Sequence, residues 1–405
     1  MIMIKIRDYF FSLLLLTLYK SIFLLPFILF TAPSHSQVII EERTISDGVI
    51  HKIIINQLDT LVINLLQIDI KNPDYSLITV KADNKLNAKE TTSSMVEMLN
   101  DSGYQVIAAL NADFFEADGE VVNNMISEGK IIKAVKFTDS PFNSFVNSQF
   151  ALLGNGKLLI EQFVFSGLLI LPGKTIIEIE RVNSRTDSNS VTLYNSFQGK
   201  TTPIQPENWH VYERELIPTG KRLDTLLFIP GNVLNNPSEI TIGNDGFILS
   251  SNNKMACYLE REFREADTVK VLLKFIPNYG NIISLVGGWP QLVKNGINLI
   301  SADSTIEGII PNFAFRRHPR TGIGFSEDST KIYFITVDGR QQSSRGMTLV
   351  EFADLMIEEG IYHGLNLDGG GSTTMIIDGE VVNNPSDFIG ERKVGNCIAV
   401  IRRKF

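Results

Sequence analysis

The chain has 405 residues, of which 44% are hydrophobic and 20% are charged, and its formal net charge is −8. An acidic chain is poorly suited to sequence-independent nucleic-acid binding, which depends on neutralising many phosphates, so we expect no nucleic-acid partner. A small phosphorylated ligand is not excluded, because a few local arginines are enough to bind it.

The N-terminal segment has the layout of a secretory signal peptide. Lys5 and Arg7 precede a long apolar stretch, and small residues follow it at Ser34 and Ser36. We predict a signal peptide over residues 1–36, cleaved after Ser36; an uncleaved N-terminal anchor is the alternative. No later stretch is apolar over the length that spans a bilayer. We therefore expect an exported protein, periplasmic or secreted, with no stable membrane span after cleavage.

The first half of the remaining chain contains strand patterns and one helix pattern. Residues 38–70 alternate between apolar and polar positions or run apolar between turn residues, which predicts hairpin strands. The sequence TTSSMVEMLNDSG predicts a helix, with Ser94 and Glu97 at capping-box spacing and Gly103 as its stop. A strand, YQVIAALNADFF, follows this helix directly.

A strand-rich middle, residues 150–285, separates that part from a second helix. Short apolar segments in the middle alternate with turn signals such as LLGNGK and IGNDG, and we expect them to elaborate a single fold. The sequence MTLVEFADLMIEEG predicts the second helix, with Thr348 and Glu351 at capping-box spacing and Gly360 at its end. It leads into a strand that ends in the sequence LDGGGST.

We predict an α+β fold: a sheet-rich single catalytic domain with a mixed β-sheet, two main helices and a strand-rich middle elaboration. Residues 37–89 would be N-terminal strands packed on a catalytic domain formed by residues 90–405. We expect no internal repeat and no flexible linker. Cys257 and Cys397 could pair in an exported protein, but a buried free thiol at Cys397 is equally consistent with the sequence.

Polar residues cluster at the ends of apolar strands, where a rigid scaffold commonly carries a functional site. The clusters are NADFF (111–115), GGWPQLVKNG (287–296), RRHPRTGIGF (316–325), VDGR (337–340), NLDGGGSTT (366–374) and NNPSDFIGERKVGN (383–396). Three consecutive glycines exceed what a tight turn needs, and each additional glycine costs conformational entropy on folding. Bare amides in such a turn can form a concave nest that attracts an anion. The loop lacks the lysine and spacing of a Walker A motif and is not a dinucleotide fingerprint.

These motifs, taken together and in this order, resemble the phosphodiester glycosidase family. The resemblance rests on NADFF, GGWPQLVKNG, RTGIGF, DGR followed by SRGMTLVEFADLM, LNLDGGGSTTM, and NPSD with a later arginine, and it spans about residues 90–402. It implies cleavage of the C1–O bond of a sugar joined through phosphate to another group, of the N-acetylglucosamine-1-phosphodiester type. The products would be a free sugar and a phosphomonoester.

That chemistry requires a carboxylate near the anomeric carbon and cations or N–H donors around the phosphate. The catalytic candidates are Asp368, which we place first, Asp113 and Asp338. The candidates for binding phosphate and substrate are Arg320, which we place first among the arginines, Arg340, Arg392, Asn111, Asn366, Gly369, Gly370, Gly371, Ser372, Thr373 and Gly288. A structural role is favoured for His318 and for the phenylalanines at strand ends, and Trp289 is a candidate for stacking on a sugar.

The sequence leaves three alternatives open. The three aspartates could converge on Ca²⁺ or Mg²⁺ through oxygen ligands, although the interpretation requires no cofactor. With metal ions the same residues would suit a phosphodiesterase that cleaves the P–O bond. A glycan-binding protein without catalysis is the third alternative. The expected partner in each case is a small-molecule or glycan ligand, a phosphodiester for the two enzymes, whose sugar the sequence does not identify.

Overall fold

The structure, a computed structural model, describes residues 38–138, 146–222, 225–234, 242–243, 245–300, 306–309 and 311–403. The predicted signal peptide over residues 1–36 lies outside these ranges. Within them, none of the helices combines the length and the apolar character needed to cross a membrane.

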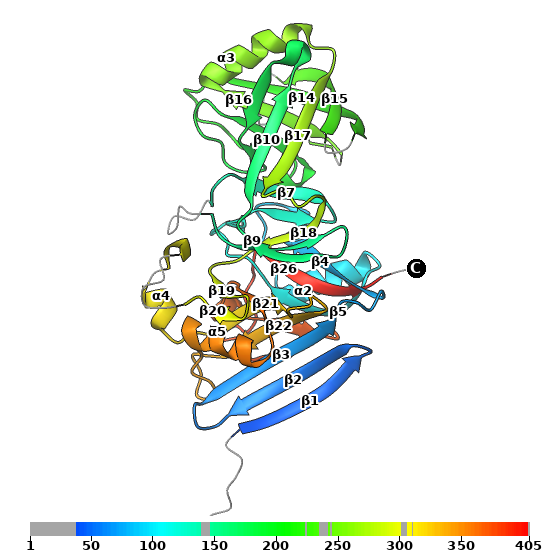
Figure 1. Cartoon of the computed structure of the whole chain (residues 1–405). Coiled ribbons are helices and arrows are strands. Elements are labelled where there is room, and N and C mark those ends of the chain that lie inside the picture. The colour runs from blue at the N-terminus through cyan, green and yellow to red at the C-terminus, as the bar shows by residue number, and fades with distance from the viewer. Residues whose placement is uncertain are drawn as a thin grey trace, which may run out of the picture. The chain divides into compact units, whose positions relative to one another are not determined.

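The described residues form three sheets (Figure 1). The eight-stranded sheet has the order β1 (Val38–Ser46), β2 (Val49–Asn56), β3 (Leu61–Asp69), β22 (Lys331–Val337), β21 (Arg320–Phe325), β23 (His363–Asn366), β19 (Gln291–Lys294) and β20 (Ile297–Asn298). The five-stranded sheet has the order β25 (Glu380–Val381), β24 (Met375–Ile377), β5 (Gln105–Asn111), β26 (Asn396–Arg402) and β4 (Tyr75–Lys81).

The third sheet contains thirteen strands, most of them from the strand-rich middle. Their order is β11 (Ile176–Ile179), β10 (Val164–Ile170), β17 (Val269–Ile276), β15 (Thr225–Leu234), β14 (Val211–Arg222), β16 (Phe247–Asn252), β13 (Val191–Asn195), β12 (Arg181–Val182), β7 (Lys130–Val135), β6 (Met125–Ser127), β18 (Ile282–Gly287), β8 (Gln149–Leu153) and β9 (Leu158–Glu161). The strands β12 and β13 pair in parallel, which makes this sheet mixed.

Four α-helices accompany the sheets in the described ranges. They are α2 (Thr92–Asp101), α3 (Asn253–Glu262), α4 (Pro311–Phe315) and α5 (Leu349–Glu358). The two helices expected from the sequence are therefore present as α2 and α5. The helix α3, which packs against β14 and β16, and the short helix α4 were not predicted, so the expectation of two main helices is incomplete.

The eight-stranded and five-stranded sheets face each other across a common apolar core. Leu66 of β3, Phe334 of β22, Leu110 of β5 and Ile398 of β26 are all buried in that core. Since alternate strand residues point to opposite faces, the remaining side chains of these strands need a second cover. Helices supply it: α5 packs on the outer face of the larger sheet, and α2 packs on the outer face of the smaller one.

The N-terminal strands belong to these two sheets. The strand β3 pairs with β22, and β4 pairs with β26 at the other end of the chain. The middle sheet has a core of its own, but side chains of β8 pack in two different cores. Phe150 packs between the two facing sheets, and its neighbour Ala151 packs in the core of the middle sheet. The middle is therefore joined to the rest by shared packing.

The helix caps differ in how well the sequence predicts them. The capping box of α5 is confirmed: the Thr348 hydroxyl accepts from the Glu351 amide at 3.2 Å, and the Glu351 carboxylate accepts from the Thr348 amide at 2.9 Å. In α2 the cap is Thr91, whose hydroxyl accepts from the Ser94 amide at 3.1 Å. The predicted box between Ser94 and Glu97 is wrong, because the helix begins one turn earlier.

Cys257 is exposed on α3, and Cys397 is buried in β26. Both are free thiols, so the two cysteines do not form a disulfide.

Candidate active site

The polar clusters that the sequence places on separate strand ends meet at the loop after β23. The Asp368 amide donates to the carbonyl of Ala112 at 2.8 Å, and the Gly370 amide donates to the carbonyl of Pro319 at 2.9 Å. The Asn111 side chain donates to the carbonyl of Asp368 at 2.6 Å. The loop is thus held between the end of β5 and the start of β21.

Each of the three glycines in this loop has a close neighbour on the side where a Cβ would lie. A Cβ on Gly369 would lie 2.6 Å from the carbonyl oxygen of Pro319. Gly370 has a φ of +63°, and its Cβ would lie 3.1 Å from Nη2 of Arg340. A Cβ on Gly371 would lie 2.2 Å from Nη2 of Arg392. The glycines therefore admit two guanidinium groups of the chain itself.

This arrangement corrects part of the predicted anion nest. The sequence suggested that the amides of residues 369–371 are free for a ligand, but the Gly370 amide is already engaged by Pro319. What the bare backbone provides is close approach of Arg340 and Arg392, and these two cations supply the positive charge of the loop.

The Asp368 carboxylate lies at the head of the loop, in a partly buried position. Burial raises the pKa of Asp368 to about 6, although the Ser372 hydroxyl and the positive charges of Arg392 and Arg340 oppose this rise. Ser372 itself is buried. A carboxylate that titrates near neutral pH beside two arginines is typical of functional sites.

Two polar pairs stand beside the loop. Arg340 is exposed, and its Nη2 lies 3.2 Å from Nδ1 of His318. Burial and the charges of Arg320 and Arg340 lower the pKa of His318, which favours the neutral imidazole near pH 7. Arg392 forms a bidentate ion pair with Asp387, with Nε to Oδ2 at 2.7 Å and Nη2 to Oδ1 at 3.0 Å.

Asp338 is buried behind the loop. Its carboxylate accepts from the Asn384 amide at 3.1 Å and from the Asn383 side chain at 3.3 Å. The Asn383 side chain also donates to the carbonyl of Thr373 at 3.0 Å. Burial raises the pKa of Asp338 to about 6. Asp338 is thus connected to the loop through one asparagine.

Asp113 is buried at the end of β5, next to the end of β18. Both of its carboxylate oxygens accept from Asn123, one from the amide at 3.0 Å and one from the side chain at 2.7 Å. A Cβ on Gly287 would lie 2.6 Å from Oδ2 of Asp113, so the carboxylate is packed against that glycine. Burial raises the pKa of Asp113 to about 7.

Arg320, the arginine that the sequence placed first for binding phosphate, is buried, and its donors are used within the protein. Its side chain is 2% exposed and donates to three backbone carbonyls, which belong to Met347, Phe313 and Arg316, at 2.9 to 3.0 Å. Its guanidinium also lies over the Phe313 ring at 5.1 Å. We therefore place Arg340 ahead of Arg320 as a ligand for an anion. Arg392 lies at the loop too, but its guanidinium is paired with Asp387, so an anion would have to share it with that carboxylate.

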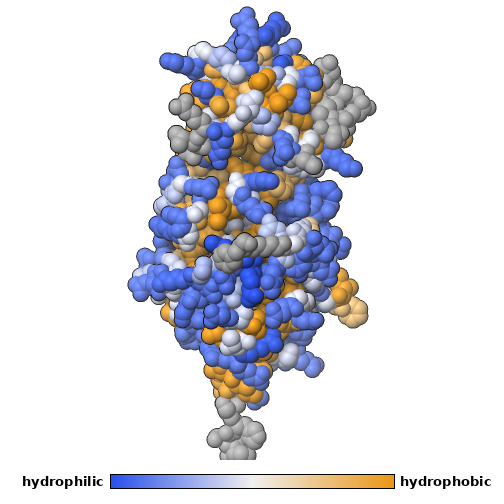
Figure 2. Space-filling view, turned by 90° about the vertical axis from the view of Figure 1, so that its right-hand side faces the viewer, coloured by the Kyte–Doolittle hydropathy of each residue, from blue (hydrophilic) through white to orange (hydrophobic). Residues whose placement is uncertain are grey.

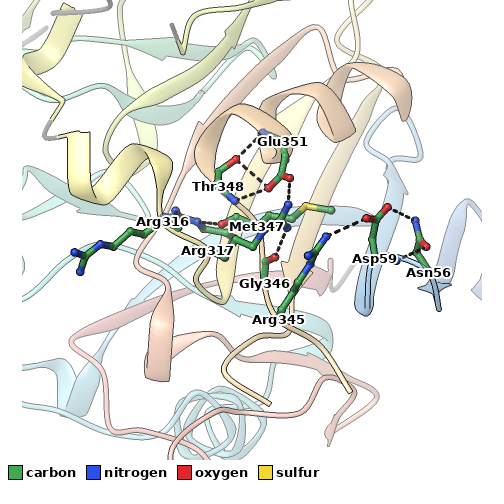
Figure 3. A network of polar contacts seen from close by, with 10 residues as sticks. Asn56, Asp59, Arg316, Arg317, Arg345, Gly346, Met347, Thr348 and Glu351 are labelled. Atoms are coloured by element: carbon green, nitrogen blue, oxygen red, sulfur yellow. Dashed lines mark hydrogen bonds and ion pairs between the residues drawn. The ribbon is translucent and has the colours of Figure 1, made fainter. Parts of the chain in front are cut away.

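The segment that carries Met347 is held by further contacts (Figure 3). Arg317 donates to the carbonyl of Gly346 at 2.9 Å and pairs with Glu351 of α5. Arg345 pairs at 3.0 Å with Asp59, which lies in the turn between β2 and β3. The segment between β22 and α5 is thus anchored at both sides.

Several other predicted substrate-binding residues are buried and connect backbone segments. Asn366 donates to the carbonyl of Trp289 at 2.7 Å, and Thr373 accepts from the Thr321 hydroxyl at 3.2 Å. A Cβ on Gly288 would lie 2.5 Å from the carbonyl oxygen of Asn366, so this glycine permits close strand packing. Asn111, already bonded to Asp368, is fully buried as well. These residues position the loop.

The aromatic residues at the strand ends pack on one another. The Trp289 and Phe313 rings stack at 4.9 Å, and the Phe114 ring meets both edge-on at 6.4 Å. The Trp289 Nε1 donates to the carbonyl of Glu307 at 2.7 Å. This packing supports the structural role that the sequence favoured for the phenylalanines. Trp289, the candidate for stacking on a sugar, packs in the same aromatic cluster.

Sequence reasoning missed four polar residues near the site: Asn123, Asn383, Asp387 and Glu307. Glu307 is buried and accepts from the backbone amide and the hydroxyl of Ser148 at 2.9 and 2.7 Å, which ties it to the start of β8. Asp387 lay within the quoted NPSD motif without receiving a role.

A repeat in the sequence could have revealed the two asparagines. The heptapeptide DGEVVNN occurs at residues 118–124 and again at 378–384, so the expectation of no internal repeat is wrong. An Asn-x-Asp sequence precedes each copy at the end of a strand. Asn123 and Asn383 stand at the same place in the two copies, and each binds a buried aspartate.

The three aspartates do not gather around a common metal position. In the ranges that the structure describes, no group of three or more His, Cys, Asp or Glu side chains is placed to hold a metal ion. The suggested convergence of Asp113, Asp338 and Asp368 on Ca²⁺ or Mg²⁺ is therefore not supported by the geometry.

The fold and the site together define a sheet-rich protein with a carboxylate and two guanidinium groups beside a glycine loop. Residues 228–401 match the phosphodiester glycosidase family, and over this range the chain is similar to members of that family. The matched range contains the glycine loop and both arginines beside it, whereas Asp113 lies before it.

Individual relatives match shorter parts of the chain. It is 31% identical over 112 residues to N-acetylglucosamine-1-phosphodiester alpha-N-acetylglucosaminidase of Mus musculus, which covers 26% of this chain and 21% of the mouse protein. It is 40% identical over 84 residues to an uncharacterized SPbeta prophage-derived protein of Bacillus subtilis, covering 21% of this chain and 13% of that protein. These matches thus span about a fifth or less of the relatives' own lengths.

Two solved structures share the fold over most of the chain. A hypothetical protein from Synechocystis has a TM-score of 0.67 at 16% identity and covers 90% of this chain and 64% of its own. A protein of Burkholderia pseudomallei has a TM-score of 0.62 at 21% identity and covers 84% of this chain and 74% of its own. At these identities the likeness concerns the fold alone.

Proposed function

We propose that the chain is an exported hydrolase that cleaves the C1–O bond of a glycosyl phosphodiester of the N-acetylglucosamine-1-phosphodiester type. The match of residues 228–401 to the phosphodiester glycosidase family supports this reaction class. The observation that carries the proposal is the position of the Asp368 carboxylate at the head of a glycine loop that admits Arg340 and Arg392.

The two arginines would bind the phosphate. A phosphodiester carries one negative charge, and cleavage of the C1–O bond leaves a second negative charge on the departing phosphate oxygen. Guanidinium groups of Arg340 and Arg392 would stabilise that added charge, and their planar donors suit phosphate oxygens. Because phosphate is a good leaving group, little help from a general acid is needed.

Asp368 would act on the sugar. As the C1–O bond breaks, positive charge develops at the anomeric carbon, and an ionised carboxylate stabilises it. The oxygen of a water molecule then bonds to C1, and the proton released from that water passes to the carboxylate. The products are the free sugar and a phosphomonoester.

Asp113 and Asp338 are proposed as supporting carboxylates. Both are buried and held by asparagines, and both have raised pKa values, which suits positioning and electrostatic roles behind the loop. Export is proposed from the signal-peptide pattern of residues 1–36 alone.

The test is a product assay on UDP-N-acetylglucosamine and on N-acetylglucosamine-1-phosphodiesters with the wild type, Asp368→Asn and the matched control Asp101→Asn. Asp101 is exposed at the end of α2. We expect free N-acetylglucosamine and a phosphomonoester from the wild type and the control. Loss of an essential carboxylate should lower the rate of Asp368→Asn by about 100-fold or more.

The products separate the alternatives. Release of N-acetylglucosamine 1-phosphate, abolished by a chelator, would instead indicate a metal-dependent phosphodiesterase. Binding without turnover, equal in the wild type and Asp368→Asn, would indicate a glycan-binding protein.

A further inference from the structure

A second candidate site lies in the middle sheet, where the structure contains a cavity of about 340 Å³. Its lining comes from strands that are far apart in the sheet order, including β17, β13, β7 and β6. The sheet is curled, since β10 contacts β7 and β11 contacts β13 across its inner face. The mouth of a curled sheet is a common place for a small-molecule site, and the volume is within the usual range.

The wall of the cavity is mixed, with somewhat more apolar than polar surface. Ile131, Leu226, Phe247 and Leu273 all line it, and all four pack on the core of the middle sheet while remaining only partly buried. Part of their surface therefore faces the cavity. Hydrophobic side chains are also visible among hydrophilic ones on the face drawn in Figure 2. Covering such surface with an apolar ligand would be favourable at about 25 cal/mol per Å².

The charged residues around the cavity are mostly cationic. Lys130, Lys221 and Lys274 line it, against a single carboxylate, Asp245. Among the described residues, none of these three lysines has an ion-pair partner at 4 Å or less. A ligand with an apolar body and an anionic head group could therefore contact the apolar residues with its body and the lysines with its head group.

We propose that this cavity binds a single-chain amphipathic anion, such as an aliphatic carboxylate or an alkyl phosphate. The chain would lie against the four apolar residues, and the head group would lie at the lysines. The site is separate from the glycine loop and does not depend on the proposed glycosidase reaction.

The test is calorimetric titration of the full chain with decyl phosphate, decanoate and the uncharged control decanol. Leu273→Trp would fill the cavity, Lys130→Gln/Lys274→Gln would remove cations, and Lys254→Gln on α3, outside the cavity lining, is the matched control. We expect saturable binding of the two anions with a negative heat-capacity change, as apolar burial requires.

We expect Leu273→Trp to bind all ligands at least about tenfold more weakly, which is the effect of losing about 1.4 kcal/mol of contact. The double lysine variant should lose affinity for the two anions and keep its affinity for decanol, while Lys254→Gln should match the wild type. Tighter binding of decyl phosphate than decanoate would identify a phosphate head group.

Two results would overturn the proposal. One is the lack of saturable binding of either anion by the wild type. The other is equal affinity for the anions in the wild type and the double lysine variant. The second comparison does not depend on Leu273→Trp, because exposed or partly exposed lysines can be replaced with little effect on folding.

Discussion

At the scale of single residues, the three glycines after Asp368 differ in which group approaches the side where a Cβ would lie. Gly369 allows a backbone carbonyl to approach, whereas Gly370 and Gly371 allow guanidinium groups to approach. The same residue type therefore has a packing role at one position and an electrostatic role at its neighbours.

Gly371→Ala should impair activity more than stability. A Cβ would lie 2.1 Å from Oδ1 of Asp387 and 2.2 Å from Nη2 of Arg392, so the ion pair must move away from the loop. Both atoms are ends of flexible side chains, and the cost in unfolding free energy should stay below about 1 kcal/mol. We expect kcat/KM to fall by about tenfold or more, because a misplaced cation no longer meets the phosphate.

Gly288→Ala provides the opposite case. Its Cβ would lie 2.5 Å from the backbone carbonyl oxygen of Asn366, which cannot move without displacing β23. We expect a loss of about 2 kcal/mol or more in unfolding free energy, measured by urea denaturation. Equal effects of the two variants on stability would contradict this distinction.

The pH dependence of activity should report the pKa of Asp368. Burial raises that pKa to about 6, and the proposed reaction needs the ionised carboxylate, so kcat/KM should rise with pH through about 6. Arg392→Gln removes a charge that favours ionisation, which should move this limb to higher pH. If the rise of kcat/KM occurs at the same pH in Arg392→Gln as in the wild type, a group other than Asp368 controls it.

At the scale of elements, Arg320 holds the segment between β22 and α5 to the start of β21. Arg320→Lys keeps the charge but cannot reach the three carbonyls that the guanidinium binds. We expect a loss of about 3 kcal/mol or more in unfolding free energy, since charge-assisted bonds in a buried site are broken. Arg340→Lys, at an exposed position, should cost less than about 0.5 kcal/mol. Similar stability of both variants would return Arg320 to the list of phosphate ligands.

The cap of α2 is a second prediction at this scale. The structure assigns the cap to Thr91, whereas the sequence pattern suggested Ser94. Thr91→Ala should therefore lower the unfolding free energy by about 1 kcal/mol, and Ser94→Ala should lower it less. Thr348→Ala, at the confirmed cap of α5, is the matched reference. Chemical denaturation of the three variants gives the comparison.

At the scale of the whole molecule, buried carboxylates couple the fold to pH. The pKa of Asp113 is raised from its ordinary value of 3.8 to about 7, so the protonated form is favoured in the folded state. Its contribution to stability is present in full below pH 3.8 and is lost as the pH rises to about 7.

Asp113→Asn should therefore flatten the dependence of unfolding free energy on pH between about 4 and 7, compared with the wild type. The new amide also faces the donors of Asn123, which adds a penalty that does not change with pH. The slope is thus the diagnostic quantity, and parallel curves for variant and wild type would refute the assignment.

The sequence predicts local features well where a short segment contains all the information. The hairpins β1 to β3, the helix α5 and its capping box follow from periodicity and cap spacing within continuous segments of the chain. The helix α3 was missed because the sequence around it was interpreted only as strands and turns. The pairing of β3 with β22 joins residues more than 260 positions apart, and no local pattern specifies such a pair.

For the candidate site, too, some features can be predicted from the sequence and others depend on the tertiary structure. The sequence alone predicted the loop, its leading carboxylate and the arginines as a candidate site, because glycines and charges at strand ends are informative by themselves. Only the tertiary structure decided that Arg320 is buried under backbone carbonyls while Arg340 and Arg392 lie against the glycines. The reason is physical: whether an arginine is free to bind an anion depends on its burial and on its hydrogen-bond partners, and residues far away in the chain supply both.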